Sequence, residues 1–202
     1  MDPKRNDHVR LLIFDVGGVM VDGFDVRPDI AAHLGIEPER CNALLKAADF
    51  QRLLAGGTSV TDYWRTFSEL AGTEVNEDLW ATFFRPTRRE RMYALVERLK
   101  DHYRVVAGTN TLDPHYVVHQ RRGDYDIFHA TYASHLLHAA KPDRAFYHAI
   151  VQAEQVAPEG ALFIDDLQQN VEGARQAGLQ ALHFTDAQAL TDALEPLLPP
   201  RE

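Results

Sequence analysis

A small set of carboxylate, hydroxyl, amide and amine side chains follows the apolar runs of this sequence. One carboxylate comes directly after the apolar residues 11–14, and the two glycines at 17 and 18 let the backbone approach a bound group closely. Carboxylates and a fixed ammonium in one crevice can hold a divalent cation beside an anionic substrate. The set consists of Asp15, Thr109, Asn110, Lys141, Asp165, Asp166 and Asn170.

These segments, in this order, resemble the four motifs of the haloacid dehalogenase superfamily of hydrolases, with a helical cap inserted after the first motif. The resemblance covers nearly the whole chain. It implies a three-layer, Rossmann-like α/β core with a parallel sheet and a small all-helical cap, and the chain resembles the sugar-phosphate phosphatase branch. The matching stretches are residues 11–19, 109–111, 141–143 with 146–147, and 163–166 with 170–174 and 178.

The carboxylates of this set have a role in phosphate chemistry only if a cation accompanies them. A phosphate dianion beside three carboxylates would otherwise be repelled, so we expect Asp15 and Asp166 to bind one Mg²⁺, with Lys141 as a fixed positive charge. Asp15 could then attack phosphorus in line and form an aspartyl-phosphate that water hydrolyses. This hypothesis requires the carboxyl groups of Asp15 and Asp166 to lie within roughly 8 Å of each other.

The remaining polar residues of the set are expected to assist these two. We expect Thr109, Asn110 and Lys141 to bind the phosphate, with the hydroxyl and the ammonium holding its equatorial oxygens as charge shifts in the transition state. Asp165 and Asn170 are expected to orient Asp166 and metal-bound water. Asp15, Thr109 and Lys141 are therefore the predicted catalytic residues.

Gly17 departs from the pattern of the family. Most phosphatases of the superfamily carry a second aspartate at this position, where it protonates the leaving oxygen and later activates water. The backbone carbonyl of Gly17 can still bind Mg²⁺, but acid–base assistance worth ~10²–10⁴ in rate is missing. Three alternatives are open: a leaving group that departs without much protonation, a replacement acid such as Asp22 or Asp25, or a site that binds phosphate and turns over slowly.

Two other functions compete with a Mg²⁺-dependent phosphatase. A metal-independent dehalogenase acting on small haloacids would use the same nucleophile and lysine and would also lack the second aspartate. The adjacent Asp165 and Asp166 argue against it, because displacement at carbon gains nothing from extra carboxylates beside an anionic substrate. A catalytically weak phosphate-binding protein on the same fold is the third reading, since fold alone does not establish activity.

Short apolar runs alternate with helical patterns along most of the chain. Strands that alternate with helices predict a parallel sheet covered on both faces, and an acid at the carboxyl end of such a strand lies where open α/β sheets bind ligands. The expected strands are residues 11–15, 104–107, 130–133, 161–164 and 181–184, and the expected helices of this part include residues 144–154 and 166–178.

The stretch between the first two expected strands is too long for a simple crossover. Its helical patterns, residues 30–34, 40–50, 59–71 and 77–84, predict an inserted cap over residues 21–86, with the core formed by residues 1–20 and 87–202. A small helical module needs large side chains to bury enough area. The residues expected to form its core are Trp64, Phe67, Trp80, Phe83 and Phe84.

The composition excludes several kinds of partner. A formal net charge of −9 argues against a nucleic acid or an anionic membrane, because either would need a basic face. No run of about 18 apolar residues could span a bilayer, and the single cysteine, Cys41, fits a reducing compartment. We therefore expect a cytoplasmic monomer or homodimer whose partner is a small phosphorylated metabolite.

Two pairs of histidines have spacings that can make metal sites, His115 with His119 and His135 with His138. No third ligand of matching type is evident near either pair. We therefore expect these histidines to have surface or capping roles.

Overall fold

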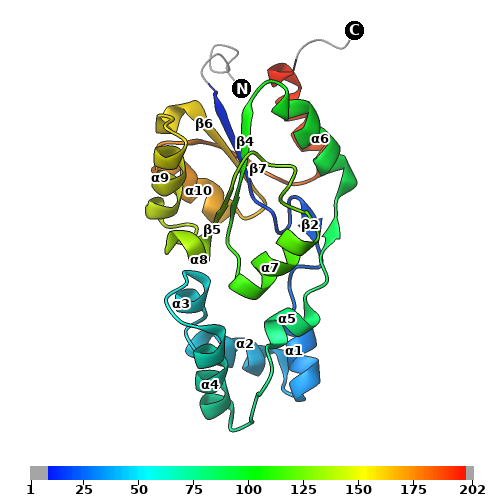
Figure 1. Ribbon diagram of the computed structural model, residues 1–202, viewed down its shortest axis with the longest axis vertical. Helices are drawn as coiled ribbons and strands as arrows, with labels where there is room; N and C mark the ends of the chain where they lie inside the picture. The colour runs from blue at the N-terminus through cyan, green and yellow to red at the C-terminus, as the bar shows by residue number, and fades with distance from the viewer. Residues whose placement is uncertain (1–8, 199–202) are drawn as a thin grey trace.

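The computed structural model describes residues 9–198, which form a core and a smaller helical unit beside it (Figure 1). Residues 1–8 and 199–202, which the sequence analysis assigns to the core, lie outside the described residues. The core sheet is parallel throughout. Its strand order is β5 (Thr131–Ala133), β4 (Arg104–Thr109), β1 (Leu11–Phe14), β6 (Ala161–Asp165) and β7 (Gln180–His183).

The central strand β1 shows why the core has three layers. All four of its residues are fully buried, and alternate side chains point to opposite faces of the sheet. Leu12 and Phe14 join the cluster that includes α6 (Glu90–Lys100) and α11 (Ala187–Leu194), whereas Leu11 and Ile13 join that of α9 (Arg144–Ala153) and α10 (Gln168–Gln176). The predicted α/β fold class is confirmed.

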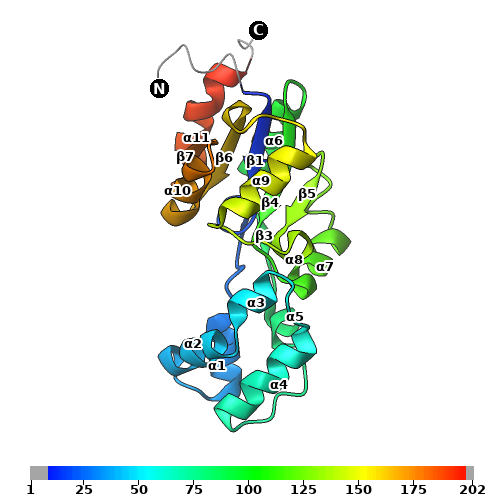
Figure 2. The same ribbon diagram turned by 90° about the vertical axis from the view of Figure 1, so that its left-hand side faces the viewer.

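Two further helices, α7 (Asp113–Arg121) and α8 (Ser134–Leu137), follow strands β4 and β5. Both lie at the end of the core that faces the helical unit (Figure 2). Among residues 9–198, no helix combines the length and the apolar character needed to cross a bilayer.

The helical unit, which we call the cap, lies between two short strands. These are β2 (Val21–Asp22) and β3 (Thr87–Arg88), which pair antiparallel where the chain leaves and re-enters the core. The predicted aromatic core is present: Trp64, Phe67, Trp80 and Phe84 are buried in one cluster, and Phe83 packs against it. The cap helices are α1 (Arg27–Leu34), α2 (Pro38–Ala47), α3 (Phe50–Leu54), α4 (Val60–Ala71) and α5 (Leu79–Phe83).

One predicted cap helix is wrong in its extent. The pattern at residues 40–50 predicts a single helix, but α2 ends before Asp49 and α3 begins after it. Asp49 has a left-handed backbone (φ 66°), which interrupts the helix, and its carboxylate accepts a hydrogen bond from the Arg52 backbone N–H at 3.3 Å. Ser59 caps α4, because its side chain accepts a hydrogen bond from the Asp62 N–H at 3.0 Å.

The cap touches the core at two places. Between α5 and α7, the His115 Nε2–H donates to the Trp80 carbonyl at 3.1 Å, and its ring stacks on Phe84 with centroids 3.8 Å apart. Between α3 and α8, the Ser134 hydroxyl donates to the Leu54 carbonyl at 2.7 Å. These contacts lie at the end of the sheet where the strands finish, so the cap covers the edge at which the predicted catalytic residues lie.

The expectation of surface roles is wrong for His115 and His119. Both rings are buried, because α7 lies under the cap, and the His119 Nδ1 atom bonds to the buried Asp124 carboxylate at 2.8 Å. Nothing in the spacing of the two histidines reveals that α5 covers them.

Burial of His115 should make stability fall in weak acid. Desolvation lowers the pKa of His115 to about 4, below the value of about 6.5 for an exposed histidine. The depressed pKa means that the folded state favours the neutral ring. The contribution of His115 to the free energy of unfolding is therefore complete above pH 6.5 and is lost as the pH falls toward 4. Between pH 7.5 and 4.5, the free energy of unfolding measured with urea should fall in both proteins. The fall should be about 2–3 kcal/mol smaller in His115→Gln than in the wild type.

The matched control is His102→Gln, which changes an exposed histidine. It should keep the pH dependence of the wild type. Equal pH dependence in His115→Gln and the wild type would contradict the assignment of a buried, neutral His115.

Candidate active site

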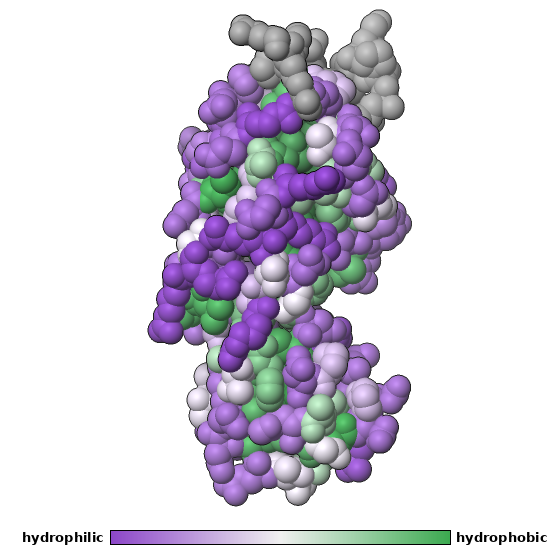
Figure 3. Space-filling model, turned by 90° about the vertical axis from the view of Figure 1, so that its right-hand side faces the viewer, coloured by the Kyte–Doolittle hydropathy of each residue, from purple (hydrophilic) through white to green (hydrophobic). Residues whose placement is uncertain are grey.

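The predicted residues meet at the edge of the sheet formed by the carboxyl ends of its central strands. Register places Phe14 of β1 opposite Ala107 of β4 and Ile164 of β6. The next residue, Asp15, therefore lies level with Asp165, and Thr109 ends the neighbouring strand β4. Figure 3 shows that the molecule narrows between the core and the cap.

Lys141 joins two of the carboxylates. Its Nζ atom lies 2.7 Å from Asp15 Oδ1 and 2.7 Å from Asp165 Oδ2, and the residue is 4% exposed. Burial alone would lower the pKa of Lys141, but the two carboxylates raise it above its ordinary value. The ammonium is therefore charged and fixed in place.

Asn110 holds the backbone of this lysine. Its side-chain amide donates to the Lys141 carbonyl at 3.0 Å, and its oxygen accepts from the Lys141 N–H at 2.9 Å. Both ends of the amide are thus engaged by the chain itself. The structure shows Asn110 as a positioning residue for Lys141, and direct contact between Asn110 and phosphate stays a prediction.

Asp165 is surrounded by donors. Its Oδ1 atom accepts from the Leu167 N–H at 2.8 Å and from the Asn170 side-chain amide at 3.0 Å, and its Oδ2 atom accepts from Lys141. Asn170 thus bonds to Asp165, and its expected role in orienting Asp166 and metal-bound water stays a prediction. The Asn170 Oδ1 atom is buried and has no hydrogen-bond partner among the described residues.

The acidic cluster fits a divalent cation. Single carboxylate oxygens of Asp15, Asp165 and Asp166 all lie within 4.8 Å of one another, close to the span of about 4 Å across an octahedral Mg²⁺ site. The distance condition set for Asp15 and Asp166 is therefore met.

The charges of the cluster also fit a divalent cation. Burial raises the pKa of Asp15 to about 7, although Lys141 acts in the opposite direction, and burial with Asp165 raises the pKa of Asp166. One ammonium does not balance three carboxylates, so a divalent cation would supply positive charge that the chain lacks.

Two glycines let the first loop approach this cluster. Gly18 has φ +80°, and a Cβ atom there would lie 2.2 Å from Asp166 Oδ2, so any larger residue would displace the carboxylate. At Gly17, a Cβ atom would lie 3.3 Å from the ring of Phe24. Coordination of a metal by the Gly17 carbonyl stays a prediction.

Arg89 is a residue of the site that the sequence analysis missed. Its guanidinium donates one hydrogen bond to the carbonyl of Gly18 and two hydrogen bonds, of 2.6 and 3.0 Å, to the carboxylate of Asp22. No sequence signal connects these positions, because the whole cap lies between them. The guanidinium lowers the pKa of Asp22, which argues against this carboxylate as a proton donor.

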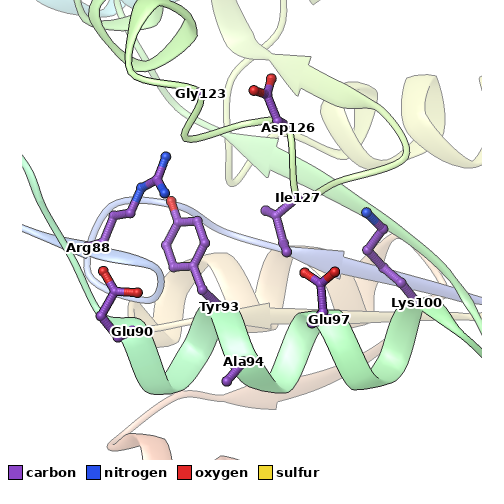
Figure 4. Close-up of a pocket in the computed structure, with 9 residues that line it drawn as sticks. All are labelled: Arg88, Glu90, Tyr93, Ala94, Glu97, Lys100, Gly123, Asp126 and Ile127. Carbon is purple, nitrogen blue, oxygen red and sulfur yellow. The ribbon is translucent and has the colours of Figure 1, made fainter.

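An open groove of about 480 Å³ lies elsewhere, between α6 and the loop around Gly123 (Figure 4). It contains none of the predicted site residues. Its charged lining is mixed, with Glu90, Glu97 and Asp126 beside Arg88 and Lys100. The Arg88 guanidinium is already paired with the buried Asp124 at 2.6 Å, so we assign this groove no part in the chemistry.

The sequence matches the family described as haloacid dehalogenase-like hydrolase over residues 9–178. It is 27% identical to the sesquiterpene phosphatase astK of Aspergillus oryzae, across 92% of this chain and 95% of that protein. It is also 23% identical to the D-ribitol-5-phosphate phosphatase of Bacteroides thetaiotaomicron, across 85% and 90% of the two chains.

The fold is similar to that of solved structures from the same family. One is a Bacteroides thetaiotaomicron enzyme crystallised with magnesium and inorganic phosphate, with a TM-score of 0.68 and 20% identity. The match covers 88% of this chain and 94% of that one.

Replacement of Gly18 by alanine should disturb the cluster without unfolding the chain. The added methyl group would collide with Asp166, so we expect Gly18→Ala to weaken Mg²⁺ binding at least tenfold, read from the thermal stabilisation at increasing Mg²⁺ concentration. Gly35→Ala is the matched control, because Gly35 also has a positive φ (+63°) but no atom within 4 Å of the added Cβ. Equal Mg²⁺ midpoints in the two variants would contradict this role of Gly18.

Proposed function

Because the chain belongs to the haloacid dehalogenase-like hydrolases, we propose that it hydrolyses a small phosphate monoester in a Mg²⁺-dependent reaction through an aspartyl-phosphate on Asp15. The observation that carries this proposal is the cluster of three carboxylates around one buried lysine. Its position under the cap supports a small substrate. Two relatives support the same class of substrate, since one is named a sesquiterpene phosphatase and the other a D-ribitol-5-phosphate phosphatase.

Each residue of the site has a distinct task in the proposed reaction. The Asp15 carboxylate would attack phosphorus, and the bond from phosphorus to the leaving oxygen would break as the aspartyl-phosphate forms. The leaving oxygen would take up a proton from solvent, and a proton would return to solvent when water attacks the intermediate. Lys141 and the Thr109 hydroxyl would hold the phosphate oxygens as charge moves onto them. Water would then attack the phosphorus of the intermediate and release Asp15 with inorganic phosphate.

A bound Mg²⁺ would neutralise the phosphate and let it approach the carboxylates. Asp15, Asp166 and the Gly17 carbonyl would hold the ion, and Asp165 would keep Lys141 and the first turn of α10 in place. The cap would exclude bulk water during the attack and would limit the size of the substrate.

The same geometry disfavours a metal-independent dehalogenase. A haloacid is itself an anion, and a third carboxylate beside it would raise the energy of the bound state without contributing to displacement at carbon. A sugar phosphate remains one candidate within the proposed class of substrates.

The first test is a phosphatase screen with the Asp15→Asn variant. We expect Mg²⁺-dependent release of phosphate from at least one small monoester, and a loss of roughly 10³-fold or more in the variant, because an amide cannot act as the nucleophile. Asp101→Asn is the control, since Asp101 is exposed at the end of α6, outside the cluster, and it should keep its activity.

Two outcomes of this screen would contradict the proposal. Halide released from a haloacid in the presence of EDTA would establish the dehalogenase function. Phosphate bound to the protein without any turnover would establish a binding protein.

A second test addresses the missing acid. The ion pair with Arg89 keeps Asp22 ionised, so we expect Asp22→Asn to change kcat by less than about threefold on the best substrate and to keep the shape of the pH profile. A loss of ~10²-fold together with the basic limb of the pH profile would instead identify Asp22 as the replacement acid.

A further inference from the structure

Phe24 is a large hydrophobic residue that stays exposed although the backbone around it is fixed. Its exposed fraction is 42%. On one side, Gly23 has φ +68° and packs so closely that a Cβ atom would lie 3.2 Å from the Arg85 carbonyl. On the other side, Val26 is buried in the cap core. The exposure of the Phe24 ring is therefore built into the junction between core and cap.

The ring of Phe24 also lies against the first loop of the site. A Cβ atom added at Gly17 would be 3.3 Å from both the Cγ and the Cδ2 atom of the ring, and Gly17 is two residues beyond Asp15. The phosphate end of a substrate would be held at the sheet edge by Asp15 and Lys141. The rest of the molecule must extend toward the cap, where it meets this junction.

The carboxylates next to Phe24 are paired with arginines. Asp22 accepts hydrogen bonds from Arg89 on both of its oxygens, and Asp25 accepts side-chain bonds of 2.7 Å from Arg27 on both of its oxygens. A substrate hydroxyl placed over the face of the Phe24 ring would lose its hydrogen bonds to water, because the ring itself offers no donor or acceptor group. An apolar group would instead gain by covering the exposed ring.

We propose that the leaving group of the substrate packs on Phe24, so that the site selects phosphate monoesters of apolar alcohols over phosphorylated polyols. This inference rests on the proposed phosphatase function. Leu167, which directly follows Asp166 in the chain, is another large hydrophobic residue that is exposed (48%). Phe24 is thus assigned as a specificity-determining residue.

Propyl phosphate and glycerol 1-phosphate provide a matched comparison, because they share a three-carbon skeleton and differ in their hydroxyl groups. We expect the wild type with Mg²⁺ to favour propyl phosphate in kcat/KM. Along a series of n-alkyl phosphates from ethyl to hexyl, kcat/KM should rise about two- to fourfold per methylene that is buried. The affinity for n-alkylphosphonates, measured by calorimetry, should rise in parallel.

In Phe24→Ser, both kcat/KM for the alkyl phosphates and the affinity for the alkylphosphonates should depend much less on chain length. Phe24→Leu should retain much of this dependence. Leu70→Ser is the control, because Leu70 is exposed to a similar extent (48%) but lies in the last turn of α4, within the cap. It should keep the dependence of the wild type.

The outcomes separate this inference from the function on which it rests. Absence of phosphate release from every monoester of the screen, with phosphonate affinity that rises with chain length and flattens in Phe24→Ser, would support the apolar subsite and refute the phosphatase. A flat wild-type series, a preference for glycerol 1-phosphate, or an unchanged slope in Phe24→Ser would overturn the inference while leaving a measured phosphatase activity intact. If the protein neither hydrolyses any monoester nor binds the alkylphosphonates, both the apolar subsite and the phosphatase function are overturned.

Discussion

The ion pairs of Lys141 with Asp15 and Asp165 are the interaction on which the site depends. All three residues are buried, so each charge has lost most of its hydration and relies on the others for compensation. Loss of the ammonium would leave two carboxylates facing each other, at a cost of roughly 3–5 kcal/mol. The arrangement also explains why the cluster suits a divalent cation, since Asp166 adds a third carboxyl group whose charge the lysine does not balance.

The surrounding backbone is built to keep this lysine in position. Asn110 binds its peptide groups from the end of β4, and the following Pro142 packs directly on α10. At Gly173 of that helix, a Cβ atom would lie only 2.6 Å from the Pro142 carbonyl, so glycine is required for the contact. The Tyr147 hydroxyl donates to the Asn170 carbonyl at 2.7 Å and ties α9 to the same turn. Neighbouring strands and helices therefore contribute to a single rigid support.

The cap meets this support through α5 on α7 and through α3 on α8, and it joins the core by the paired strands β2 and β3. Arg89 connects this junction to the site, because one guanidinium contacts both the Gly18 carbonyl and Asp22. Phe24 lies in the same junction, beside Gly17. The segment that links the two units thus also lies beside the acidic cluster, where the proposed chemistry and the proposed selection of the substrate would take place.

The sequence by itself predicted the alternation of the core strands with helices, the helical patterns and aromatic core of the cap, and the acids at the strand ends, because periodicity and strand termini are local properties of the chain. It did not predict the short strands β2 and β3, helix α8, or the break between α2 and α3. Only the tertiary structure decided the partners of those residues: Asn110 binds Lys141, Asn170 binds Asp165, and Asp22 is held by Arg89. Likewise, docking of α5 on α7 buried His115, and the turn after β2 placed Phe24 against Gly17. Such pairings depend on how elements far apart in the chain pack together, and no local pattern of residue types encodes the distance between them.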